Sequence, residues 1–133
     1  VITNSLDIAT TLQGAGKDVL LLGGRMAADV PATFGELTLS EIRRFRVDLC
    51  FSAPVAVHPA TGAFFYDLQE AEIAIAMAAQ ALQSVILADH SKLGKTSRVQ
   101  SWEVGEIGRL VTNHAADEEQ LAAFRQAGVD VVA

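Results

Sequence analysis

The run Val85-Ile86-Leu87-Ala88, followed at once by Asp89-His90-Ser91-Lys92-Leu93-Gly94, decides the fold. Four apolar residues in a row, without polar alternation, are typical of a strand that is buried on both faces. The polar segment that follows places charged side chains at the carboxyl end of this strand. In an open parallel sheet, ligands bind at that end of the strands.

Further strand-like and helix-like segments alternate on both sides of this run in the sequence. Further apolar runs predict strands at 1–3, 19–22, 47–51, 109–112 and 129–132, and the 19–22 run is expected to be buried. Between them, helices are expected from about 8 to 14, 35 to 44, 67 to 82 and 117 to 127, with Asp67 and Glu70 at the spacing of a capping box. The longest loop is expected at 52–66. This alternation predicts an α/β domain, a mostly parallel sheet with helices on both faces.

Composition limits the classes of partner. The 133 residues are enough for one domain, and the net charge of −6 argues against binding of nucleic acid or of a membrane surface by this segment. No apolar run is long enough to span a membrane and no secretory signal is visible, so we expect a cytoplasmic protein. Because the sequence begins at Val1, inside a predicted strand and without Met, we expect it to be part of a longer protein.

Metal and cofactor chemistry has little support. Cys50 is the single cysteine, which excludes an internal disulfide and a cysteine-rich metal site. His58, His90 and His114 lack metal-ligand spacing. Gly94-Lys95-Thr96 is not the end of a P-loop, because Asp89 stands where that motif needs glycine, and no hydrolase nucleophile motif is present. We therefore expect no metal and no cofactor.

The residues directly after the strands are the candidate ligand contacts. They are small, polar and glycine-rich and include cations, a combination that suits an anion and a phosphate best. They are Asn4, Ser5, Gly23, Gly24, Arg25, Ser52, Asp89, Lys92, Asn113 and His114. For several of them a structural role is the alternative: Asn4 and Ser5 as helix caps, Gly23-Gly24 as a turn, and Arg25 as a solvated side chain.

Four segments together resemble a known family. They are Val1-Ile2-Thr3-Asn4-Ser5, Leu20-Leu21-Leu22-Gly23-Gly24, Tyr66-Asp67-Leu68-Gln69-Glu70-Ala71-Glu72 and Leu87-Ala88-Asp89-His90-Ser91-Lys92-Leu93-Gly94. In this order and spacing they resemble the C-terminal sensor domain of DeoR-type bacterial transcriptional regulators, over essentially the whole chain. The resemblance implies a single sensor domain over residues 1–133, similar in fold to ribose-5-phosphate isomerase, glucosamine-6-phosphate deaminase and the acyl-CoA transferases.

The resemblance also implies a ligand and a partner. Sensor domains of this family typically bind a phosphorylated sugar or a related metabolite, which weakens operator binding through an N-terminal winged helix domain. Lys92 matches the lysine that holds the phosphate. Asn4-Ser5, Gly23-Gly24 and Glu70 match positions that line the pocket, and we include Asp67 with Glu70.

The chain departs from the family pattern in two places. The family's Asp-x-Gly-Thr-Thr phosphate loop, with its strand, does not precede the first motif. Ser52-Ala53-Pro54-Val55 stands where many members have Gly-Ala-Asp-Gly.

Three hypotheses follow. The first is the effector-binding domain of a transcriptional repressor of sugar metabolism, which is not an enzyme, forms a homo-oligomer and meets operator DNA only through the winged helix domain. The second is a sugar-phosphate isomerase or deaminase of the same fold, with Glu70 or Asp67 as the base. The third is a structural oligomerisation domain that associates through its alanine-rich helix.

Overall fold

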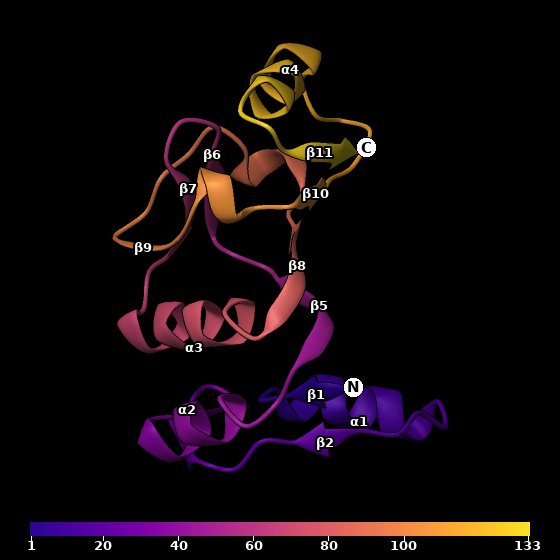
Figure 1. The fold of residues 1–133 in the computed structure, drawn as a ribbon, viewed down its shortest axis with the longest axis vertical. Helices are drawn as coiled ribbons and strands as arrows, with labels where there is room; N and C mark the ends of the chain where they lie inside the picture. Colours follow the sequence, from indigo (N-terminus) through magenta and orange to yellow (C-terminus); the bar gives the residue numbers. More distant parts are fainter. The chain divides into compact units, whose positions relative to one another are not determined.

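The computed structural model describes residues Val1–Ala133, which form two compact units, Val1–Phe45 and Arg46–Ala133 (Figure 1). The first contains β1 (Ile2–Thr3), α1 (Leu6–Gly14), β2 (Leu20–Leu21), β3 (Arg25–Met26), β4 (Thr33–Phe34) and α2 (Glu36–Ile42). The second contains β5 (Val47–Ser52), β6 (Ala56–His58), β7 (Gly62–Phe65), α3 (Leu68–Ala78), β8 (Ala81–Leu87), η1 (His90–Lys92), β9 (Val99–Glu103), η2 (Val104–Glu106), β10 (Arg109–Val111), α4 (Glu118–Gln126) and β11 (Asp130–Val132).

Two strand pairs shape the first unit. β1 and β2 pair in parallel, with Thr3 opposite Leu21, and β3 and β4 form an antiparallel pair. The expectation of a buried strand at 19–22 is wrong for Leu20 and Leu21, which are 42% and 46% exposed, and only Leu22 in the run is fully buried. Within this unit β2 pairs only with β1, so its two faces are not covered in the way that a central strand requires.

A four-stranded parallel sheet organises the second unit. Its strand order is β11-β10-β8-β5, so β8 is a central strand, as the sequence predicts. The core includes Ile86 on β8, Leu110 on β10, and the fully buried Phe124 of α4. Figure 1 shows α4 beside β11, at the end of the chain. The predicted α/β class with a mostly parallel sheet is confirmed.

The expectation of a long loop at 52–66 is wrong. Residues 56–58 and 62–65 form an antiparallel hairpin, and β9 joins it to give a second sheet of order β6-β7-β9. Gly62 permits this close approach, because its φ is +123° and a Cβ there would lie 2.0 Å from the carbonyl oxygen of Trp102. The sequence did not predict β9, since its buried Ser101 and Trp102 lie between exposed polar residues.

The boundary between α3 and β8 also differs from the expected one. The helix ends at Ala78 instead of 82, and β8 begins at Ala81 instead of Val85. Ala81 lies opposite Val47 and Gln83 opposite Leu49, so pairing with β5 extends the strand through residues that favour a helix. None of the four α-helices has the length and apolar character needed to cross a membrane.

Candidate functional site

The turn after β8 carries two of the predicted site residues. Asp89 caps η1 by accepting the backbone N–H of Ser91 at 2.8 Å, and it also accepts the Ser91 hydroxyl. The side-chain hydrogen bond from Ser91, followed by the backbone one, lowers the pKa of Asp89 and keeps its carboxylate charged. The Lys92 N–H donates to the Asp89 carbonyl at 3.0 Å, while its ammonium group takes part in neither of the two ion pairs of the chain.

The neighbouring strand ends lie at the same edge of the sheet. The backbone N–H of His90 donates to Oδ1 of Asn113 at 2.9 Å, which joins the turn after β8 to the segment after β10. Ser52, the last residue of β5, pairs with Ile86 of β8. The structure therefore brings Ser52, the Asp89–Lys92 turn and Asn113 to the carboxyl edge of the four-stranded sheet, as the sequence predicts.

Asp67 and Glu70 lie at the amino end of α3. Asp67 is the N-cap and accepts the N–H of Gln69 at 3.3 Å, but no hydrogen bond links Glu70 back to Asp67, so the expected capping box is wrong. A reciprocal capping box forms instead at η2, between Glu103 and Glu106. Burial, and after it the negative charge of Asp67, raises the pKa of Glu70. No hydrogen bond or ion pair connects these two carboxylates with the turn after β8.

In the first unit, the carboxyl ends of β1 and β2 lie side by side. Ser5 caps α1 by accepting the N–H of Ile8 at 3.2 Å, so its side chain has the structural role that the sequence left open. Nδ2 of Asn4 donates to the Thr33 carbonyl at 2.8 Å, and the buried Thr33 hydroxyl donates to the Leu22 carbonyl at 2.8 Å. Thr33 thus bridges the two strand ends, a role that the sequence did not indicate.

The Gly23-Gly24 turn is held by α2. The Gly23 N–H donates to Oε2 of Glu41 at 2.7 Å, and the Thr38 hydroxyl donates to the Gly23 carbonyl at 2.6 Å. Thr38 and Glu41 are three residues apart and lie on one face of the helix. This spacing is the only sequence signal that points to them. Arg25, the next residue after the turn, is exposed and forms no ion pair.

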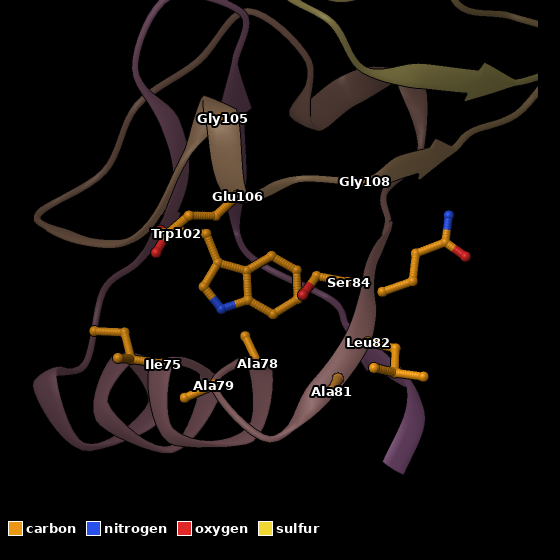
Figure 2. Close-up of a pocket in the computed structure, with 11 residues that line it drawn as sticks. Ile75, Ala78, Ala79, Ala81, Leu82, Ser84, Trp102, Gly105, Glu106 and Gly108 are labelled. Atoms are coloured by element: carbon orange, nitrogen blue, oxygen red, sulfur yellow. The ribbon is translucent and has the colours of Figure 1, made fainter. Parts of the chain in front are cut away.

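A pocket of about 370 Å³ lies at the opposite end of β8 from Lys92 (Figure 2). Figure 2 shows the Trp102 ring between Ala78 of α3 and Ser84 of β8. The lining is about equally polar and apolar and consists of Ile75, Ala78, Ala79, Ala81, Leu82, Gln83, Ser84, Trp102, Gly105, Glu106 and Gly108. No predicted site residue is among them. No pattern in the sequence indicates this pocket, because the pocket depends on where α3 ends.

Two of the histidine side chains make polar contacts within or between loops. Nδ1 of His58 accepts the N–H of Ala60 at 3.1 Å, and Nδ1 of His90 lies 3.2 Å from Oδ1 of Asn113. No group of three or more His, Cys, Asp or Glu side chains is arranged to hold a metal ion.

Comparison with known proteins identifies the class. The model of the family described as the DeoR C-terminal sensor domain matches residues 1–114. The chain therefore belongs to the DeoR C-terminal sensor domain family, and the predicted resemblance is confirmed.

Individual relatives agree with this assignment. The chain is 29% identical over 133 residues to the HTH-type transcriptional repressor GlcR of Bacillus subtilis, covering 99% of this chain and 51% of the relative. It is 31% identical over 131 residues to the HTH-type transcriptional regulator GlpR of Haloferax volcanii, covering 98% and 51%. It is 28% identical over 113 residues to a glycerol-3-phosphate regulon repressor of Haemophilus influenzae, covering 84% and 44%.

The chain spans about half the length of these curated relatives. All three are named as repressors or regulators, and none as an enzyme. The chain is thus a sensor domain of the DeoR family, as the first hypothesis predicts, and the names of its relatives give no support to the isomerase or deaminase alternative.

Proposed function

We propose that this sensor domain binds a phosphorylated sugar or a related phosphorylated metabolite, and that binding weakens the hold of the whole repressor on its operator DNA. The observation that carries the proposal is the turn after β8. There Lys92, which forms no ion pair, follows β8 at the carboxyl edge of a parallel sheet, the edge at which such sheets generally bind ligands. A lysine in this position binds phosphate as a point charge.

The other predicted residues are proposed as further effector contacts. In the second unit they are Ser52, Asp67, Glu70 and Asp89, and in the first unit Asn4, Ser5, Gly23, Gly24 and Arg25. One relative is itself named for a glycerol-3-phosphate regulon, which fits an effector of the phosphorylated class.

Operator DNA is the proposed partner of the whole protein and not of this domain. The net charge of −6 opposes binding of this segment to a phosphate backbone. We propose that a winged helix domain outside this chain makes the DNA contacts, and that the regulator acts in the cytoplasm as a homo-oligomer, because such proteins read paired half-sites.

The test uses the full-length regulator. Fluorescence anisotropy on its operator is measured with a panel of sugar phosphates and with the same sugars without phosphate. An effector at about 100 times its Kd also adds roughly 2.7 kcal/mol of stability, which a thermal shift detects. We expect only phosphorylated compounds to release DNA and to raise Tm.

Lys92→Ala is the decisive variant and Lys95→Ala its matched control, a lysine three residues further along in an exposed position. We expect Lys92→Ala to weaken effector binding about tenfold or more, since a hydrogen bond to a charged group contributes roughly 1.5–3 kcal/mol. Failure of every compound to change DNA binding would disprove the proposed function. If Lys92→Ala and Lys95→Ala change effector binding equally, Lys92 is not an effector contact.

A further inference from the structure

The backbone N–H and the backbone carbonyl of Gly23 are both hydrogen-bonded by side chains of α2. Its N–H donates to Oε2 of Glu41 at 2.7 Å, the short distance typical of a charge-assisted hydrogen bond. Its carbonyl accepts the hydroxyl of Thr38 at 2.6 Å, and Thr38 is fully buried. The turn is therefore held in place from within the protein, without any ligand.

This arrangement changes what the turn recognises. A glycine N–H at the end of a parallel strand is a common contact for a phosphate oxygen. Here the Glu41 carboxylate already accepts a hydrogen bond from the Gly23 N–H. A phosphate at this position would lose the N–H donor and would lie against a second negative charge, and like charges in direct contact repel.

Glu41 has hydrogen-bonding capacity left for a ligand. Oε2 accepts the Gly23 N–H, whereas Oε1 accepts no hydrogen bond from the protein and is not among its buried unpartnered atoms. Arg25 does not neutralise the charge, because it forms no ion pair with Glu41. A carboxylate in this state accepts hydrogen bonds from hydroxyl or ammonium groups.

We propose that Glu41 determines specificity in the effector site: it excludes anionic groups from the Gly23-Gly24 turn and binds the hydroxyl or amino groups of the effector there. This inference rests on the proposed function for the identity of the effector. Within the first unit, the turn therefore favours a part of the effector that carries hydroxyl or amino groups over a part that carries a phosphate or a carboxylate.

The first experiment tests the occupied N–H without any assumption about the effector. Inorganic phosphate is titrated into the ¹⁵N-labelled protein, and the amide resonance of Gly23 is followed. We expect no phosphate-dependent shift of Gly23 in the wild type and a shift in Glu41→Ala, where the N–H becomes free. A Gly23 shift in the wild type, or its absence in a folded Glu41→Ala, would overturn the proposal. Glu36→Ala, an exposed glutamate of the same helix, is the control and should behave as the wild type.

The second experiment measures specificity in the full-length protein. A sugar monophosphate that binds and its bisphosphate counterpart are compared in the wild type, Glu41→Gln and Glu36→Gln. Glutamine keeps an acceptor for the Gly23 N–H and removes the charge, so folding should be preserved. We expect Glu41→Gln to reduce the preference for the monophosphate by about tenfold or more, and Glu36→Gln to leave it unchanged.

The two proposals fail in different ways. If no sugar phosphate binds, the proposed function fails, and the Gly23 titration with inorganic phosphate still decides the role of Glu41. If monophosphates and bisphosphates bind with the same ratio of affinities in the wild type and in Glu41→Gln, the proposed function stands and the role of Glu41 is wrong.

Discussion

Oδ1 of Asn113 accepts the backbone N–H of His90 at 2.9 Å, across 23 residues of sequence. This bond fixes the turn that carries Lys92 to the end of a neighbouring strand, so the position of the lysine depends on β10 as well as on β8. A residue that has no charge and follows a different strand thus becomes a positioning residue for the proposed phosphate contact.

Asn113→Ala tests this dependence. Loss of the acceptor should lower the free energy of unfolding by only about 1 kcal/mol, because the contact is exposed and water replaces it. Effector affinity should fall several-fold, since the turn is no longer fixed. Thermal shifts with and without effector measure both quantities. His90→Ala is the control, because it keeps the backbone N–H and removes only the ring. An unchanged affinity in Asn113→Ala would show that the bond does not position Lys92.

Gly24→Ala should be strongly destabilising. The φ of Gly24 is +147°, and a Cβ there would lie 2.0 Å from Oγ1 of the buried Thr38 and 2.8 Å from the Phe34 carbonyl oxygen. Backbone strain and overlap together should cost about 2–4 kcal/mol, measured by urea unfolding. Gly105→Ala is the matched control, because a Cβ there meets nothing within 4 Å. Similar losses for both substitutions would contradict this account of the turn.

Short sequence signals, such as helix caps and apolar runs, correctly predicted the helices and strands in which they lie. The last helix begins after its cap Asp117 and ends before Gly128, whose φ is +91°, as the sequence indicates. The continuous apolar run of β10 likewise appears as a parallel strand. In these segments the neighbours in sequence determine the structure, so the sequence is sufficient.

Elements that depend on distant pairing were not predicted. β9 lacks an apolar pattern and forms because β7, more than 30 residues earlier, provides its hydrogen-bonding partner. Dependence on distant contacts also explains why only part of the candidate site was predicted. Gly23 was predicted as a site residue because it directly follows a strand. Glu41 was not predicted, because it lies 18 residues away in sequence and reaches Gly23 only in the folded unit. Neither the pairing of β9 with β7 nor the hydrogen bond between Gly23 and Glu41 is indicated by a hydrophobic repeat in the sequence.

Cys50 should be inert at neutral pH. Burial raises the pKa of its thiol to about 11, and the thiolate is the reactive form. Since the folded pKa lies above the thiol's ordinary value of 9.0, the stability contributed by the neutral thiol is fully present below about pH 9. It is lost between about pH 9 and pH 11, at about 1.4 kcal/mol per pH unit. Urea unfolding at pH 8 and pH 10.5 measures this loss. It should be smaller in Cys50→Ala, and an equal loss in both proteins would exclude Cys50 as its source.

Glu70 provides a second test of the same sign, at a carboxylate whose charged form the fold disfavours. Its pKa is raised by burial and by the negative charge of Asp67, so its contribution to stability is present below the unfolded pKa and is lost as the pH rises through the folded pKa. At pH 7 the charged form is therefore slightly disfavoured, and the effect is small because the Glu70 side chain is exposed. Glu70→Gln should gain stability relative to the wild type between pH 4 and pH 7, as measured by Tm. Glu72→Gln, an exposed neighbour on α3, is the control.

The same variant separates structure from function at this position. A residue that lowers stability is often retained because a ligand needs its charge. If Glu70 binds the effector, Glu70→Gln should raise the Tm of the free protein at pH 7 and reduce the further rise that the effector produces. If the effector produces its full shift in Glu70→Gln, Glu70 is not an effector contact. The proposed phosphate contact at Lys92 does not depend on this result, because no hydrogen bond or ion pair links the two side chains.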